Sequence, residues 1–507
     1  MKKLLSVLLV LAVVSGAGIG VLAWRVNRTG EQVTVEETTL MGDKSAAEGV
    51  TVRAEAGWRN RLCWDISHTL GQTPEAQLTL NPEGEWHGPY SWEGVELRVS
   101  YAGNDLLEVV DHPQGLMKLG QELLERSKDG EEVRATADLG DYLEHYPIRF
   151  GLELPGVMYN GYFPGLTFET SEFFFADQEQ TAKMFHDFFP IPIREEEPIQ
   201  AVCLPSSRGD GAPESYELRL QQKDPVEEAE NSAEVPAVPA VGMSEVDLVC
   251  AQDFTEDLCV FALTNQTQSG KPLDFSEVPG GYGLYGFTFQ RVTDRNEHPN
   301  VTVEITDDTK TGVDNDSLRL MYPLPESALV TQVAIDERHQ QVLVVTLDGG
   351  EGLVTVLDMK TMKAVQTIPV AKMAWPQLVL GDDFLVIYDG DGQLVLLTEA
   401  DGRWRQRWTA ELPEQLARNV RFSRVDWRGR NETVPAAMDV RGQELLLCDY
   451  ADEFTEDCRY DVAVVNGDGV AYWGRFVTSL ASYPEGVPGP DRQLDCRITT
   501  LDVAWPD

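Results

Sequence analysis

Eight short apolar runs between Ala328 and Thr409 constrain the fold of this chain more than any other feature. They form two groups of four, with Asp348-Gly349-Gly350 inside the first group and Asp389-Gly390-Asp391-Gly392 inside the second. Asp-Gly between β-rich runs is typical of tight hairpins, because glycine accepts the positive φ that such turns require. The groups lie roughly 40 to 45 residues apart, and four antiparallel strands repeating at this interval indicate β-propeller blades. The expected strands are residues 328–335, 342–347, 353–357 and 364–370, then 377–380, 384–388, 394–398 and 404–409.

Two similar segments indicate further repetition. Residues 250–259 and 448–458 each contain Phe-Thr-Glu-Asp, ending at Asp257 and Asp457, between two apolar runs. We expect this sequence at the middle hairpin turn of a blade. The two cysteines of each segment would then face one another across a strand pair, at a separation that suits a disulfide. The predicted bridges join Cys250 to Cys259 and Cys448 to Cys458, with four buried free thiols as the alternative.

The amino-terminal half is less regular. Strand-like runs lie at residues 95–99, 106–110, 148–154 and 216–220, and two amphipathic patterns predict helices near 114–127 and 178–189. Residues 221–245 are acidic and rich in alanine and proline, which predicts a disordered, solvated loop. The predicted fold is mainly β: a degenerate β-propeller of roughly six to eight four-stranded blades with two inserted helices. Residues 501–505 are the expected ring-closing strand.

The first 28 residues predict where the chain is placed. Met1-Lys2-Lys3 precedes 21 uncharged residues from Leu4 to Trp24, and arginines follow. This length crosses ~30 Å of hydrocarbon as a transmembrane helix, and the leading lysines favour a cytoplasmic amino terminus. We expect a single-pass anchor in the cell membrane within residues 1–28, a linker at 29–48 and an extracytoplasmic ectodomain at 49–507. The alternative is a cleaved signal peptide, which would make the protein secreted.

The charge balance disfavours one large class of function. The chain carries 84 acidic and 41 basic residues, a net charge of −43, so nucleic-acid binding is not expected. An acidic excess spread along the chain indicates first a solvated surface and second a cation-binding one. The seven cysteines include no C-x-x-C pair, which argues against zinc and thioredoxin-like chemistry. Their odd number leaves at least one thiol free or paired between chains.

No motif for catalysis, a cofactor or a metal emerges. Residues 281–286, Gly-Tyr-Gly-Leu-Tyr-Gly, have the letters of a dinucleotide fingerprint. Pro279 precedes them and a β-rich run follows, so we expect a glycine-rich turn that leads into a strand. Asp389 begins a segment without the acidic last ligand of a calcium loop, which favours a hairpin turn. The seven histidines are scattered. We therefore assign no catalytic, cofactor-binding or metal-binding residue.

The run from Ala328 to Glu411, and more loosely from Val246 to Ser479, resembles bacterial membrane-anchored extracytoplasmic β-propellers. The broad class includes proteins with WD-repeat-like and quinoprotein-like blades. The chain lacks the Gly-His and Trp-Asp signature of WD repeats and the tryptophan-docking motif of quinoproteins. The resemblance therefore implies an architecture over about half of the chain and transfers no functional residue.

These observations favour a membrane-tethered binding or interaction module of the cell envelope, without catalysis. Its expected partner is a protein or a glycan, because propellers present loops around a central channel. The alternatives are an envelope hydrolase or lyase with a site at the channel mouth, and a structural assembly factor. Convergent carboxylates and histidine in a deep funnel would favour the enzyme, whereas a flat aromatic rim would favour partner binding.

Overall fold

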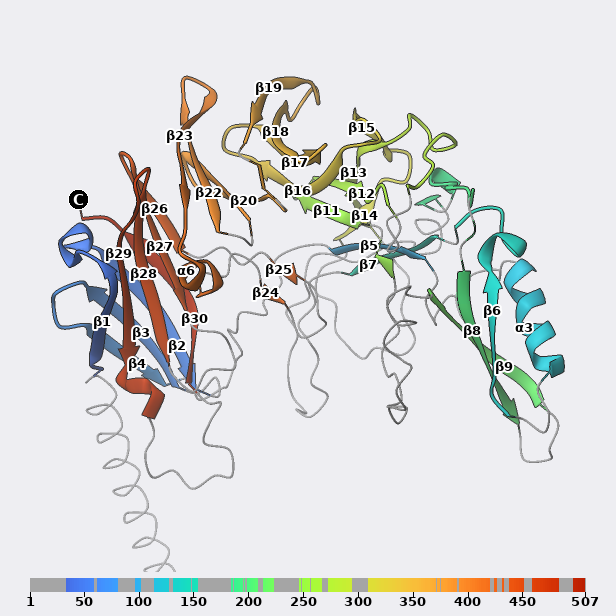
Figure 1. Cartoon of the computed structure of the whole chain (residues 1–507), viewed down its shortest axis with the longest axis horizontal. Coiled ribbons are helices and arrows are strands. Elements are labelled where there is room, and N and C mark those ends of the chain that lie inside the picture. The colour runs from blue at the N-terminus through green and yellow to red at the C-terminus, as the bar shows by residue number, and fades with distance from the viewer. Residues whose placement is uncertain are drawn as a thin grey trace, which may run out of the picture. The chain divides into compact units, whose positions relative to one another are not determined.

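The computed structural model shows a mainly β protein with few helices (Figure 1). Among the residues that it describes, no helix is both long enough and apolar enough to cross a membrane. The predicted anchor from Leu4 to Trp24 lies outside those residues. The described residues are 33–58, 62–80, 96–101, 114–126, 131–146, 148–153, 184–185, 187–194, 196, 198–207, 213–222, 246–247, 249–255, 257–266, 272–293, 309–370, 372–373, 375–389, 392–419, 424–425, 431–432, 437–450, 458–482 and 496–506.

The chain divides into two compact units where the sequence predicted one continuous ectodomain. Unit 1 comprises residues 1–91 and 371–507, and unit 2 comprises residues 92–370. Unit 1 therefore combines strands from both ends of the sequence. Each unit contains its own antiparallel sheets and its own apolar clusters.

Unit 1 has three antiparallel sheets of four or five strands, each built like a propeller blade. Their orders are β20-β21-β22-β23, β1-β29-β28-β27-β26 and β30-β2-β3-β4. The first of these sheets confirms the four strands predicted between residues 377 and 409. The bounds in unit 1 are β1 (Val35–Gly42), η1 (Lys44–Ala47), β2 (Thr51–Trp58), β3 (Leu62–Thr69), β4 (Glu75–Leu80), β20 (Gln377–Leu380), β21 (Phe384–Tyr388), β22 (Gln393–Ala400), β23 (Arg403–Glu411), α6 (Glu414–Asn419), β24 (Arg424–Val425), β25 (Asn431–Glu432), β26 (Ala437–Arg441), β27 (Glu444–Tyr450), β28 (Arg459–Asn466), β29 (Gly469–Thr478), η3 (Ser479–Ser482) and β30 (Cys496–Ala504).

Strands from the two ends of the chain complete two of these sheets. β30 pairs antiparallel with β2, so residues 501–504 of the predicted ring-closing strand pair with one of the first strands of the chain, and Trp505 follows the strand. β1 pairs with β29 as a fifth strand (Figure 1). β1 lies within the predicted linker at 29–48, and its mostly exposed residues give no apolar pattern. β1 ends at Gly42, where a side chain would collide with Ala471 O.

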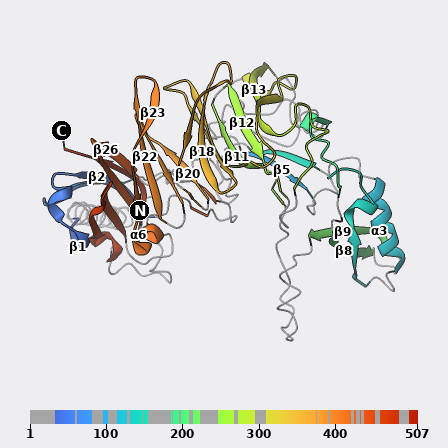
Figure 2. The ribbon, with the colours of Figure 1, turned by 45° about the horizontal axis from the view of Figure 1, so that its top comes forward.

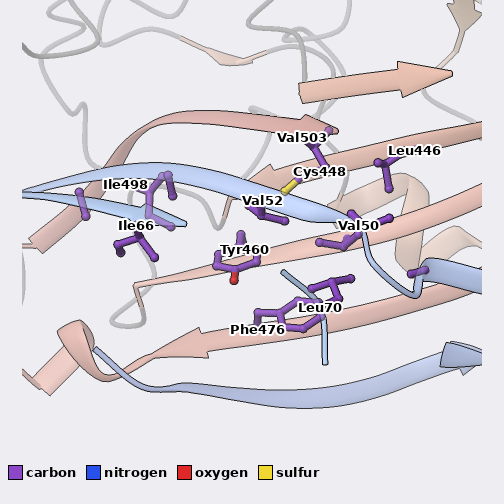
Figure 3. Packing of buried hydrophobic residues seen from close by; sticks show 14 of the residues in the cluster. Val50, Val52, Ile66, Leu70, Leu446, Cys448, Tyr460, Phe476, Ile498 and Val503 are labelled. Carbon is purple, nitrogen blue, oxygen red and sulfur yellow. The ribbon is translucent and has the colours of Figure 1, made fainter. Parts of the chain in front are cut away.

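An apolar cluster joins the β30-β2-β3-β4 sheet to the β1-β29-β28-β27-β26 sheet (Figure 3). The rings of Tyr460 and Phe476 stack with centroids 5.2 Å apart, and Trp64 and Val52 are almost completely buried. Burying each large apolar side chain contributes about 1.5–3 kcal/mol, so this cluster is a main source of stability for unit 1. The cluster also contains Ala54, Ala56, Ile66, Leu70, Leu446, Cys448, Val462, Val464, Tyr472, Ile498 and Val503.

Unit 2 contains two blade-like sheets and two smaller ones. The order β16-β17-β18-β19 confirms the four strands predicted between residues 328 and 370. A second sheet has the order β11-β12-β13-β14, with β15 also paired to β13, and two three-stranded sheets have the orders β10-β5-β7 and β6-β8-β9. The bounds are β5 (Glu96–Tyr101), α3 (Gln114–Arg126), β6 (Val133–Asp138), η2 (Leu139–Asp141), β7 (Ile148–Glu153), β8 (Pro198–Ser207), β9 (Pro213–Gln222), β10 (Val246–Asp247), β11 (Val249–Phe254), β12 (Leu258–Leu263), β13 (Gly283–Thr293), β14 (Thr309–Val313), β15 (Arg319–Pro323), β16 (Leu329–Asp336), β17 (Gln341–Asp348), β18 (Glu351–Asp358) and β19 (Ala364–Pro369).

The first predicted helix is confirmed by α3, which packs against the β6-β8-β9 sheet (Figure 2). The second is described only at residues 184–185 and 187–188, which are helical. There Phe185 and Phe189 pack against Phe261 and Tyr285, with the Phe189 and Tyr285 rings 4.9 Å apart. This aromatic contact attaches the inserted segment to the β11–β15 sheet. The predicted run at 106–110 and residues 223–245 of the predicted loop lie outside the described residues, whereas residues 221–222 of that loop belong to β9.

Both units link neighbouring sheets in the same way. In unit 2, Asp253 of β11 accepts a hydrogen bond from the main-chain N–H of Ile335 in β16, at 2.6 Å. In unit 1, Asp439 of β26 accepts one from the main-chain N–H of Trp505, just after β30, at 2.9 Å. The strands β11, β16, β26 and β30 each stand at one end of the strand order of their sheet. A carboxylate on an end strand thus satisfies a main-chain donor of the next sheet's end strand.

The two predicted disulfides are absent from the structure, in which Cys250, Cys259, Cys448 and Cys458 are not bridged to one another. The strand register explains this result. Cys259 lies opposite Phe254, and Cys448 lies opposite Val462, so neither predicted pair is directly opposed. The two segments also occupy different places: residues 250–259 span the first two strands of their sheet, and 448–458 lead from β27 to β28. Their similarity therefore does not mark equivalent turns of two blades.

Two neighbouring residues of β30 test whether the apolar cluster between the β30-β2-β3-β4 and β1-β29-β28-β27-β26 sheets stabilises unit 1. Val503 is 4% exposed within the apolar cluster, whereas the side chain of Asp502 on the opposite face is 67% exposed. We expect Val503→Asp to lower the free energy of unfolding by about 3 kcal/mol or more, because it buries an unpaired charge. Asp502→Asn should change it by about 0.5 kcal/mol at most. Urea unfolding followed by tryptophan fluorescence measures both, and equal effects would contradict the cluster's role.

Candidate functional site

The sequence features that were considered as sites prove to be turns. β13 begins at Gly283, so residues 281–286 lead into a strand and not into a nucleotide-binding helix. Asp389 Oδ1 accepts from the main-chain N–H of Gln393, as expected for the hairpin turn between β21 and β22. Among the described residues, no group of three or more His, Cys, Asp or Glu side chains is arranged to hold a metal ion.

One strand departs from the burial pattern of the other blades. The central strands β12, β17, β21 and β28 are buried on both faces, as strands between two packed layers must be. In β3, buried Trp64 and Ile66 alternate with exposed Asp65 and half-buried Ser67. Only one face of the β30-β2-β3-β4 sheet is therefore apolar. Its other face is polar and open to solvent where the structure describes it.

That polar face carries an open groove of about 580 Å³. Its charged side chains come from all four strands: Arg53 and Glu55 from β2, Asp65 from β3, Glu75 from β4 and Asp502 from β30. Ala54, Ile66, Ser67, Ala76, Gln77 and Leu501 complete the lining. The lining contains neither histidine nor cysteine. Such a shallow, polar groove can hold a charged segment but offers no enclosed cavity for a small substrate.

The groove has a marked negative balance. Glu55 and Asp65 lie directly opposite one another on β2 and β3, and like charges in this relation destabilise a sheet. Arg53 is the one positive charge of the lining, and its guanidinium lies 3.6 Å from the Asp502 carboxylate. Both side chains are more than half exposed, so the attraction between them is weak. A positively charged group placed in the groove would relieve the repulsion.

His68 belongs to the core and is not part of the groove. It is 5% exposed, and its Nδ1 lies 2.5 Å from the hydroxyl of Tyr460. Its ring also meets the edge of Phe476 with centroids 5.5 Å apart. Burial lowers the pKa of His68 below its ordinary value, while the negative charge of Glu37 opposes this effect. His68 is therefore a structural residue at the joint between two sheets.

Unit 2 contains an exposed network of charged side chains. Arg194 Nε donates to Asp274 at 2.8 Å, and its Nη2 donates to Glu277 at 2.8 Å. His145 Nε2 lies 3.0 Å from Glu277. Hydrogen bonds from Ser276 and Arg194 lower the pKa of Asp274 to about 2. Every member is already paired within the network, so its role is to attach the loop at 274–277 to the inserted segment.

Sequence reasoning missed the groove because the strands at residues 51–80 were not predicted. The signal was present: Trp64, Ile66 and His68 alternate with Asp65 and Ser67, which is the pattern of a half-buried strand. What the sequence could not supply is the pairing of β2 with β30. That pairing brings Asp502 to Arg53 across more than four hundred residues of chain.

Comparisons with known proteins add little beyond the sheets themselves. No protein-family model matches the sequence, and the search of curated proteins finds no match. Among solved structures, the chain is similar to Hsv2 of Kluyvelomyces marxianus, with 12% identity, 43% of this chain and 45% of that chain covered, and a TM-score of 0.21. It is also similar to the periplasmic gluconolactonase PpgL of Pseudomonas aeruginosa, with 13% identity and a TM-score of 0.22. That match covers 54% of this chain and 82% of PpgL. The N-terminal domain of Nup159 matches with 11% identity and a TM-score of 0.21. That match covers 52% of this chain and 55% of the Nup159 domain. The chain thus spans about half the length of the first of these structures.

The buried His68 gives a pH dependence of known sign. Its folded-state pKa is lowered, whereas in the unfolded chain it titrates near 6.5. Below this pH the unfolded state binds a proton that the folded state resists, so stability is lost as the pH falls. In His68→Gln this contribution disappears. The difference in unfolding free energy between the two proteins should change by at most about 1.4 kcal/mol per pH unit below 6.5. Urea unfolding between about pH 5 and 8 measures it, and a constant difference would contradict the assignment.

Proposed function

We propose that this protein is a membrane-tethered, extracytoplasmic binding module with propeller-like blades, which holds a positively charged segment of a protein partner in its acidic groove. The groove on the β30-β2-β3-β4 sheet is the observation that carries this proposal. Its openness and lack of histidine and cysteine favour binding over chemistry. The tether rests on the uncharged run from Leu4 to Trp24 and on the lysines before it.

The charge of the groove favours a cationic segment over a glycan. A glycan site is typically formed by aromatic rings and neutral polar groups, and the groove lining contains no aromatic residue. Four carboxylates and one arginine instead create a negative potential. Such a potential steers a positively charged partner toward the site and speeds its association. A cationic segment would also reduce the repulsion between Glu55 and Asp65, which lie opposite one another.

Groove variants test the binding proposal. The wild-type chain should bind a fluorescein-labelled oligolysine peptide with an affinity that falls as salt is added. The double variant Asp65→Asn and Glu75→Gln should bind it about fivefold more weakly, because two exposed charges are removed. Fluorescence anisotropy at several salt concentrations measures this difference.

The double variant Glu337→Gln and Glu351→Gln is the matched control, because it removes two exposed carboxylates of unit 2 and leaves the groove intact. It should bind the peptide as the wild type does. Equal loss in both variants would show that binding follows the net charge of the chain and would reject the groove as a site.

The tether is tested separately: the full chain should stay with the membrane fraction in sodium carbonate, and release would reject the anchor.

A further inference from the structure

Strand β23 carries three exposed arginines at alternate positions. It reads Arg-Trp-Arg-Gln-Arg-Trp-Thr-Ala-Glu, and Arg403, Arg405 and Arg407 are all exposed. The intervening Trp404 and Trp408 are buried, 1% and 7% exposed, and fix the strand to its sheet. Lysine and arginine together number 41 against 84 acidic residues, so three arginines on one strand form a distinct local charge.

The position of β23 makes its main chain available. β23 is the last strand in the order β20-β21-β22-β23, so among described strands only β22 pairs with it. Its other edge presents N–H and C=O groups of an extended chain, which can pair with a further strand. Arg403 and Arg405 lie opposite Ala400 and Thr398 in the register, two residues apart on one face. Their spacing is that of alternate residues in any extended peptide.

Competing charges do not neutralise these arginines. Arg405 Nη2 lies 3.7 Å from Asp401, but both side chains are largely exposed, and such a pair is weak. Arg407 occupies a β-bulge and donates to the hydroxyl of Thr398. Arg403 has no acidic partner within the described part of the chain. At physiological salt the Debye length is about 8 Å, so a ligand at this edge is affected mainly by the charges of the β22–β23 hairpin, which include Glu399, Asp401 and Glu411 beside the three arginines.

We propose that the edge of β23 is a docking site for an extended acidic peptide segment of a partner protein. The segment would lie along the edge, with carboxylates at alternate positions facing Arg403 and Arg405. Main-chain pairing would supply affinity, and opposite charges across the two strands would supply selectivity. This surface is separate from the acidic groove, so the proposal does not depend on the function assigned to that groove.

Charged edge residues also occur for another reason, because they prevent sheets from joining edge to edge. The two roles differ in what removal of the charges does. A purely protective arginine, once replaced, leaves peptide binding unchanged and increases self-association. A binding arginine, once replaced, weakens the complex with an acidic peptide.

The experiment uses the full chain and a fluorescein-labelled peptide with glutamate at every second position and threonine or valine between. Wild type should bind it, and Arg403→Gln with Arg405→Gln should bind it about tenfold more weakly. The control, Arg319→Gln with Arg338→Gln, removes two exposed arginines of unit 2 and should leave binding unchanged. Arg403→Lys with Arg405→Lys keeps the charge and should retain most of the affinity.

Further peptides separate the contributions. A peptide with lysine for glutamate should not bind this edge, and its groove binding should persist in the β23 variants. A glutamate peptide interrupted by proline should bind more weakly, because proline removes a main-chain donor. Failure of wild type to bind the glutamate peptide, or unchanged binding with increased self-association in the glutamine variant, would overturn the proposal. Binding of inorganic polyphosphate but not of the peptide would overturn it in favour of a phosphate polymer.

Discussion

The pairing of β30 with β2 is the constraint on which unit 1 depends. It places the last strand of the chain beside one of the first, and β1 is added to β29 in the same unit. Thr34 N donates to Ser479 Oγ at 3.0 Å across a separation of 445 residues. Such distant contacts require closure of very long loops, which slows folding but costs little more free energy than closure of moderate ones. Once formed, they bury the cluster around Tyr460 and Phe476.

This closure also determines which surface is left for binding. The apolar face of the β30-β2-β3-β4 sheet is used to join the neighbouring sheet, as Val52 and Ile66 show (Figure 3). The opposite face therefore need not be apolar, and in β3 it is polar. Repeat architectures require a terminal repeat with a polar outer face for solubility, and the polar face of this sheet has that character. The same face, once solvated, is free to acquire charges that select a partner.

The sequence predicted the regular blades well because their evidence is local. Apolar runs and Asp-Gly turns depend on neighbouring residues, and β16 to β23 form where those patterns lie. Helix α3 follows equally from its own periodic leucines, of which Leu119 and Leu123 are buried. The cysteine pairs failed because opposition across strands depends on register, which places Phe254 opposite Cys259 and Val462 opposite Cys448. β1 failed because an exposed edge strand has no apolar pattern to recognise.

The candidate sites were less predictable than the fold, because they arise from assembly and not from motifs. No short stretch contains the groove: its five charged residues come from four strands and both ends of the chain. The arginines of β23 lie at alternate positions of one short segment, but only the sheet order shows that this segment is an outer strand. The net charge of −43 does not reveal either feature. Salt screens exposed charges, so each charge acts mainly on groups within about one Debye length of it. The overall charge thus bears on solubility, whereas the side chains of each strand set the local electrostatic potential there.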